Sequence, residues 1–394
     1  MKRILLATAA TALIAPAAHA QESVNVGIIL GFTGPIETIT PNMAAAAELA
    51  FQEANDSGLL DMQLNPVRAD STCIDSAAAT AAAERLITAD NVAAIVGADC
   101  SGVTIAIVNN VAVPNGVVMV SPSATSPALT TIDDDGYFFR TAPSDARQGE
   151  VLAEVVTDRG IDEVAITYTN NDYGLGLAES FTASFEERGG NVAMTAAHED
   201  GRGDYSAEVA ALQASGAQHL MVFGYVDQGG RGIVQSSLDT GAFDSFFFAD
   251  GMQGQSIIDA IGAELDGKVV GTVPGSDNPG TEAFYEIAEA AGFDGTTSFA
   301  PESYDAAALI TLAIAAGGSA DRTSIRDHIL TVANEPGEEI LPGELARGIE
   351  ILLEGGEVNY IGATDVELVG PGEAAGNYRV YEIQNGSFET VEFR

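Results

Sequence analysis

The sequence predicts an α/β protein built of two doubly wound lobes, each around a parallel sheet. Short, almost entirely apolar segments of strand length alternate with alanine-rich amphipathic segments of helix length. This alternation is typical of parallel sheets that helices cover on both faces. It occurs twice along the 394 residues, and a chain of this length can form two domains with a core each.

The expected elements follow in order along the chain. In the first half, strands are expected at 24–30, 92–96 and 116–120, with helices at 43–55 and 77–88. In the second half, strands are expected at 164–168, 192–195, 220–223, 246–248 and 269–273, with helices at 151–159 and 175–188. The halves are expected to meet near Arg140-Thr141-Ala142-Pro143, where a strand gives way to a Pro-Ser-Asp helix start.

The first 20 residues have the pattern of a secretory signal peptide. Lys2 and Arg3 precede an apolar run at 4–14, and Ala18-His19-Ala20 forms a small-x-small cleavage signature. The apolar run is too short to span a bilayer, so we expect export and cleavage near Ala20 rather than a membrane anchor. The alternative is a buried N-terminal helix.

Charge and cysteine content narrow the class of protein further. The chain has 57 acidic and 16 basic residues, a formal net charge of −41. This charge disfavours nucleic acid, anionic lipid and, where no cation lies nearby, acidic ligands as partners. The acids are scattered, as on a surface suited to high salt, so we hypothesise a marine or halophilic source; full stability in salt-free buffer would contradict this.

The two cysteines, Cys73 and Cys100, indicate one disulfide in an oxidising compartment, with two buried free thiols as the alternative.

Small and hydroxyl-bearing residues follow two strands of the first half. Residues 97–102, which include Ser101, follow one strand, and residues 121–127, which include Ser123 and Thr125, follow the next. Ligands of open α/β sheets bind beyond the carboxyl ends of the strands. Unpaired amides and hydroxyls at such turns suit a carboxylate, although the same hydroxyls can act only as helix N-caps.

Aromatic and acidic residues occupy the corresponding positions of the second half. Tyr173, Tyr225 and Asp250 each follow a separate expected strand. A tyrosine offers an apolar face with a polar tip, and the aspartate can pair with a cation. In the alternative interpretation, Asp250 caps the next helix and the tyrosines pack within loops.

Several motifs together resemble a known family over essentially the whole mature chain. They are Val26-Gly27-Ile28, Thr33-Gly34-Pro35, both cysteines, Ser121-Pro122-Ser123-Ala124-Thr125, 137–141, Asn171-Asp172-Tyr173-Gly174 and 378–383. The chain resembles the periplasmic substrate-binding proteins of branched-chain amino acid ABC transporters, the leucine/isoleucine/valine-binding family. The resemblance implies a type I periplasmic-binding fold with a hinge and an interlobe ligand cleft. The implied lobes are residues 22–141 plus 272–378 and residues 142–271 plus 379–394.

The resemblance also implies roles for particular residues. Ser101 and Thr125 match positions that bind a ligand carboxylate, the Ser123 carbonyl faces the ligand ammonium, and Asp250 balances that ammonium. Tyr173 and Tyr225 match aromatic residues that close over the ligand, and Cys73 and Cys100 match the family disulfide. The expected ligand-binding set is Ser101, Ser123, Ala124, Thr125, Tyr173, Tyr225 and Asp250. Two departures alter the pocket: Ile39 aligns where the family often has an aromatic residue, and Asp250 is one methylene shorter than the usual glutamate.

By this resemblance the protein is expected to be an exported, periplasmic solute-binding component of an ABC transporter, and we expect it to be a monomer. It would capture a branched-chain or similar aliphatic amino acid by hinge closure and deliver it to a permease in the inner membrane. A binding module for an amide, urea or aromatic acid, or one serving a sensor, is the alternative. We do not expect the protein to be an enzyme or to bind a cofactor or a metal ion. The sequence lacks the HExxH, GxSxG and Walker motifs, and it lacks a complete dinucleotide fingerprint.

Overall fold

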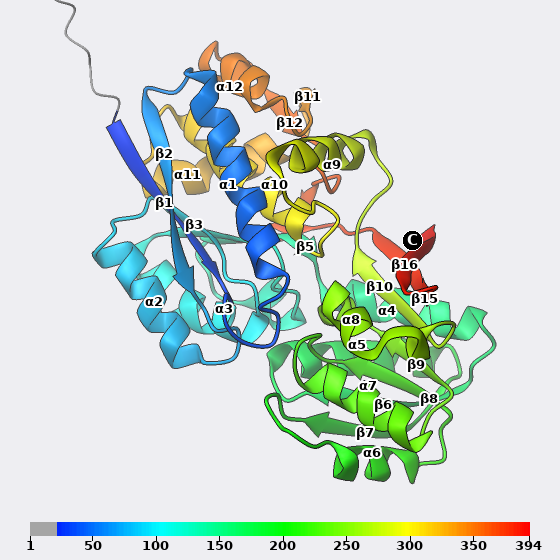
Figure 1. The fold of residues 1–394 in the computed structure, drawn as a ribbon. Helices are drawn as coiled ribbons and strands as arrows, with labels where there is room; N and C mark the ends of the chain where they lie inside the picture. Colours follow the sequence, from blue (N-terminus) through cyan, green and yellow to red (C-terminus); the bar gives the residue numbers. More distant parts are fainter. Residues whose placement is uncertain (1–21) are drawn as a thin grey trace, which may run out of the picture.

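The protein is described by a computed structural model that covers residues 22–394. The expected signal peptide, residues 1–20, lies outside the described residues. Figure 1 shows two lobes, an N-terminal one and a second one formed mainly by the middle of the chain, with the C-terminal strands beside their junction. The predicted fold class, two α/β lobes with mostly parallel sheets, is confirmed.

The first lobe is built on a seven-stranded sheet of order β13-β14-β5-β4-β3-β1-β2. Its strands are β1 (Glu22–Leu30), β2 (Met62–Asp70), β3 (Ala94–Gly97), β4 (Val118–Ser121), β5 (Phe138–Pro143), β13 (Leu368–Val369) and β14 (Glu373–Ala374). The five longer strands are parallel, and β13 pairs antiparallel to β14. The carboxyl ends of β3 and β4 therefore lie next to each other and bring their following loops together.

The second lobe is built on another seven-stranded sheet, of order β16-β15-β10-β9-β8-β6-β7. Its strands are β6 (Glu163–Thr169), β7 (Asn191–His198), β8 (His219–Phe223), β9 (Ser245–Phe248), β10 (Val269–Pro274), β15 (Tyr378–Gln384) and β16 (Ser387–Phe393). Strand β15 runs antiparallel to β10, so the end of the chain completes this sheet. The loops after β6, β8 and β9 come from neighbouring parallel strands and meet at one edge.

Helices cover both sheets, and the expected ones all form. They are α1 (Thr40–Ser57), α2 (Ser76–Thr88), α4 (Asp145–Asp158) and α5 (Asp172–Glu187). The other helices are α3 (Ser101–Ile107), α6 (Ser206–Gln213), α7 (Gly229–Thr240), α8 (Gln255–Ile261), α9 (Pro279–Ala291), α10 (Ala300–Gly317), α11 (Arg322–Ala333) and α12 (Leu345–Leu353). Helix α4 begins at the predicted Pro-Ser-Asp helix start, six residues before the helical segment expected from 151, because the Ser144 hydroxyl caps it by accepting the Ala146 N–H. In Figure 1, α1 lies along α10, and a small β11 (Glu338–Ile340) and β12 (Val358–Tyr360) sheet lies near α12.

Strand β2 was not predicted, and its position in the sheet explains why. Its sequence is polar and contains Pro66, which lacks the N–H that a central strand needs. Because β2 pairs with β1 alone at the edge of the sheet, proline and polar residues are tolerated there.

The chain passes between the two sheets three times. It leaves the first sheet after β5, returns after β10 and leaves again before β15. The exact lobe boundaries at 141, 271 and 378 remain a prediction. Within residues 22–394, no helix combines the length and apolarity needed to cross a membrane.

Candidate functional site

The residues expected to bind a ligand meet at a cavity between the lobes, called the interlobe cavity below. Six of the seven expected residues line it: Ser101, Ser123, Thr125, Tyr173, Tyr225 and Asp250. Ala124 does not line it; this residue is fully buried, and its N–H donates to the Ser121 hydroxyl at 3.0 Å. The lining is completed by Ile36, Ile39, Asp99, Cys100, Gly251 and Phe299.

The first-lobe wall presents uncharged hydroxyl groups. Ser101 begins α3 and is buried, and its Oγ accepts a hydrogen bond from the Ser126 N–H at 3.0 Å. The Ser101 hydroxyl proton therefore remains available for a ligand oxygen. The predicted disulfide between Cys73 and Cys100 is confirmed and fixes the residue directly before Ser101.

The second-lobe wall presents a buried carboxyl group. Asp250 follows β9 and is 2% exposed, and its Oδ1 accepts hydrogen bonds from the Tyr173 hydroxyl and the Gly251 N–H, both at 2.6 Å. Its Oδ2 has no hydrogen-bond partner within residues 22–394. Burial raises the pKa of Asp250 to about 6, because a charged carboxylate is poorly solvated there.

Two tyrosines cover this carboxyl group. The ring centroids of Tyr173 and Tyr225 lie 5.3 Å apart in a stacked arrangement, and the Tyr225 hydroxyl accepts a hydrogen bond from the Asn171 side chain at 3.2 Å. The two rings give the cavity an apolar surface beside its charged group, as aliphatic ligands with a polar head require.

A second buried acid close to Asp250 was missed by the sequence analysis. Asp145, at the start of α4, is fully buried, and its carboxyl group lies close to the Thr125 side chain and to Arg140. Burial and then the nearby Asp250 raise the pKa of Asp145 well above its ordinary value. The sequence marked this residue only as part of a helix start. Arg140 lies close to Asp145 and partly balances its charge, so Asp250, with its unpartnered Oδ2, is the acid available to a ligand cation.

Phe299 is another residue of the site that was not predicted from the sequence. It lies just before α10 in a left-handed conformation, with φ of 64°, and its side chain reaches the interlobe cavity from the first lobe. Its distance along the chain from the other lining residues left no pattern from which it could be found.

The two lobes touch beside the cavity. Asp227 of the second lobe accepts hydrogen bonds from the Thr38 N–H at 3.0 Å and from the Thr38 hydroxyl at 2.8 Å, and Ser126 donates to the Asp172 carbonyl at 3.0 Å. The cavity is consequently small, about 20 Å³, and holds little more than a water molecule. A larger ligand needs the lobes to separate.

These features define a two-lobed binding protein with its site between the lobes. Residues 23–340 match the family model described as periplasmic binding protein, and the chain belongs to this family. The family consists of exported binding proteins rather than enzymes, in agreement with the sequence-based prediction. Among residues 22–394, no three His, Cys, Asp or Glu side chains are grouped to hold a metal ion.

Individual relatives are similar over most of their length. The leucine-, isoleucine-, valine-, threonine- and alanine-binding protein of Pseudomonas aeruginosa is 27% identical over 82% of this chain and 87% of its own. The substrate-binding protein LivJ of Streptococcus pneumoniae, solved with isoleucine, has a TM-score of 0.78 at 22% identity and covers 95% of this chain and 99% of its own. A Rhodopseudomonas palustris solute-binding protein, solved with 4-hydroxybenzoate, has a TM-score of 0.78 at 20% identity, with coverages of 95% and 97%. The predicted resemblance to the leucine/isoleucine/valine-binding family is thus confirmed.

Proposed function

We propose that this protein captures an amino acid in the interlobe cavity and delivers it to the permease of an ABC uptake transporter. The ligand carboxylate binds at Ser101 and Thr125, and the ligand ammonium binds at Asp250 and the Ser123 carbonyl. Tyr173 and Tyr225 close over the side chain.

One observation carries this proposal: the cavity has uncharged donors on one wall and an unpartnered buried carboxylate oxygen on the other. A buried charge is costly unless it is paired. An α-amino acid supplies an ammonium for Asp250 and, two bonds away, a carboxylate for the opposite wall. The names of the relatives, which bind leucine, isoleucine and valine, support an aliphatic ligand.

Capture proceeds by hinge closure. The ligand first meets the donors of the first lobe in an open arrangement, and Asp250 then favours closure because only the closed arrangement brings it to the ammonium. The contacts between Thr38 and Asp227 join the lobes in the described arrangement, in which the cavity is too small for an amino acid. A bound amino acid keeps the closed lobes slightly further apart. We further propose that the signal peptide is cleaved near Ala20 and that the protein acts as a monomer, which leaves both lobes free to meet the permease.

A thermal-shift screen against the common amino acids tests the proposal. A ligand that binds the folded state raises the melting temperature by mass action, so shifts confined to a few α-amino acids are expected. The result that would contradict the proposal is no shift from any amino acid together with a shift from another class of compound.

An aromatic acid is a second candidate, supported by the Rhodopseudomonas palustris structure solved with 4-hydroxybenzoate. Such a ligand carries no ammonium and would leave Asp250 unpaired. Including benzoate and 4-hydroxybenzoate in the screen separates the two candidates, provided that competition with the best amino acid shows the same site.

A further inference from the structure

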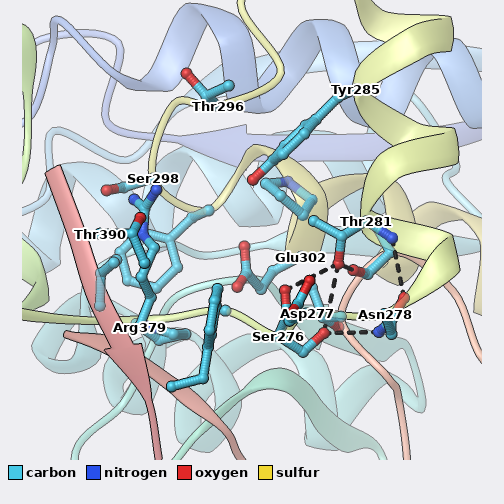
Figure 2. Close-up of a pocket in the computed structure, with 18 of the residues that line it drawn as sticks. Ser276, Asp277, Asn278, Thr281, Tyr285, Thr296, Ser298, Glu302, Arg379 and Thr390 are labelled. Atoms are coloured by element: carbon cyan, nitrogen blue, oxygen red, sulfur yellow. Dashed lines mark hydrogen bonds between the residues drawn. The ribbon is translucent and has the colours of Figure 1, made fainter. Parts of the chain in front are cut away.

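A second and larger cavity lies beside the crossings between the lobes, called the hinge cavity below. Its volume is about 310 Å³, at the lower end of the range of about 300–1,000 Å³ for small-molecule sites. Its walls include the segment that follows β10, around Ser276 and Asp277, together with Glu302 of α10 and Arg379 of β15 (Figure 2). A molecule bound here would contact both lobes. Phe299 lines both cavities and separates this one from the interlobe cavity.

Glu302 gives the hinge cavity an unpartnered acid. Its side chain is 2% exposed and lines the cavity, and its Oε2 has no hydrogen-bond partner in the part of the chain that the structure describes. Figure 2 shows Glu302 between Arg379 on one side and Ser276 and Asp277 on the other. Burial raises the pKa of Glu302 to about 8, so at neutral pH this carboxyl group is mostly protonated and can donate a hydrogen bond.

Arg379 gives the same cavity an unpaired cation. Its guanidinium makes no hydrogen bond or ion pair within residues 22–394, although the chain carries 57 acids against 16 bases. By contrast, Arg159 at the end of α4 is paired with Glu382 of the same strand β15 at 2.7 Å. A free guanidinium facing a cavity is a geometric match for a carboxylate.

The rest of the lining limits the class of ligand. Tyr285, Phe299 and Phe393 supply aromatic surface, which suits an apolar or aromatic body. Asp277 and Glu282 are exposed at the rim and disfavour a ligand with more than one negative charge.

We propose that the hinge cavity is a second binding site, for a small monocarboxylic acid with an apolar or aromatic body and a polar group at its far end. The carboxylate pairs with Arg379, the body lies against Phe299 and Tyr285, and the polar group bonds to Glu302. The site does not depend on which ligand the interlobe cavity takes.

Three matched probes test the site by isothermal titration calorimetry. The probes are 4-hydroxyphenylacetate, its uncharged amide 4-hydroxyphenylacetamide, and phenylacetate, which lacks the hydroxyl. Titrations use the wild-type protein with and without saturating amino acid, and also the Ser101→Ala/Asp250→Asn double variant, in which the interlobe site is disabled. We expect one molecule of 4-hydroxyphenylacetate per chain in all three cases. The amide is expected to bind about tenfold or more weakly, and phenylacetate to bind severalfold more weakly.

Variants of the cavity separate this site from non-specific binding. Arg379→Gln is expected to weaken the binding of 4-hydroxyphenylacetate about tenfold or more, whereas the control Arg159→Gln, at the end of α4, is expected to have no effect. Raising the pH from 7 to 8.5 ionises Glu302 but leaves the phenol of the probe neutral. Binding is expected to weaken in the wild type, because ionised Glu302 repels the anion, but not in Glu302→Gln. The proposal is overturned if no probe binds, if saturating amino acid displaces the probe, or if Arg379→Gln binds as tightly as the wild type. A failure of amino-acid binding would leave these outcomes unchanged, because the double variant is tested in parallel.

Discussion

The two walls of the interlobe cavity differ in charge and in rigidity. The first-lobe wall consists of hydroxyl groups on loops after β3 and β4, and a disulfide holds one of these loops. The second-lobe wall consists of a buried carboxyl group under two stacked tyrosines. The first wall alone suits any small carboxylate, and the second alone suits any small cation. The difference teaches that selectivity for an amino acid arises only when both walls face the same molecule.

Removing the charge of the second wall is expected to have the largest effect. Asp250→Asn keeps the shape of the side chain and leaves the ligand ammonium without its partner, which costs about 2–5 kcal/mol of binding free energy. Calorimetry with the best amino acid measures this loss. Asp244→Asn, which removes an exposed acid of the same lobe, is the control and is expected to bind like the wild type. Unchanged affinity in Asp250→Asn would remove this residue from the site.

Opening the disulfide tests the rigidity of the first wall. Replacing both Cys73 and Cys100 with alanine is expected to lower the free energy of unfolding by about 2–4 kcal/mol, because the unfolded chain regains freedom. Denaturant unfolding measures this loss. If the wall needs the crosslink for its geometry, the affinity for the amino acid also falls under conditions where the variant is fully folded; equal affinity would show that the crosslink serves stability alone.

Removing a donor of the first wall is expected to have a smaller effect on binding. Ser101→Ala deletes the hydroxyl that donates to the ligand carboxylate, a hydrogen bond to a charged group worth about 1.5–3 kcal/mol. The same change leaves the Ser126 N–H without its acceptor, so the melting temperature without ligand is measured alongside. A loss of stability without a loss of affinity would contradict the assigned role.

The pH dependence of binding also distinguishes the two walls, because the carboxyl group of Asp250 belongs to the second-lobe wall. In the ligand-free protein the pKa of Asp250 is about 6, and an ammonium favours its ionised form. The affinity is therefore expected to fall about tenfold from pH 7 to pH 5, as Asp250 becomes protonated. The folded-state stability contributed by this group runs in the opposite direction and decreases as the pH rises from about 4 to 6, because its folded pKa is raised. Asp250→Asn is expected to remove the contribution of Asp250 to the pH dependence of both affinity and stability. If the affinity of this variant depended on pH as that of the wild type does, Asp250 would not be the group that binds the ammonium.

The smallest effect is expected from the outer tyrosine. Tyr225→Phe keeps the stacked ring and removes only a hydroxyl that is bonded to Asn171 rather than to Asp250. A change of less than about fivefold in affinity is expected, since a neutral hydrogen bond contributes about 1 kcal/mol at most here. A change as large as that of Asp250→Asn would mean that the Tyr225 hydroxyl contacts the ligand directly.

The sequence was sufficient to predict those features of the fold and of the site that depend on local sequence patterns, such as the residues that follow the ends of apolar strands. Ser101 and Thr125 follow apolar strands of the first sheet, and parallel pairing brings these positions together. Asp250 follows an apolar strand of the second sheet. Strand β2 was not predicted because it is an edge strand, which tolerates polar residues and proline. Phe299 and Asp145 were not predicted as part of the site, because their positions near the cavity depend on how α10 and α4 pack. Local sequence patterns do not determine this packing. Arg379 and Glu302 meet for the same reason, since they lie far apart in the chain and share a cavity only after the C-terminal strands join the second sheet.

The central claim is that the two walls together recognise a zwitterion. The most direct test compares, by calorimetry at pH 7, the amino acid with the largest thermal shift, its amide and its analogue without the amino group. The account predicts that each analogue binds at least about tenfold more weakly than the amino acid, because each leaves one wall unpaired. Binding of the analogue without the amino group as tightly as the amino acid would contradict the claim and would favour a simple carboxylic acid as the ligand.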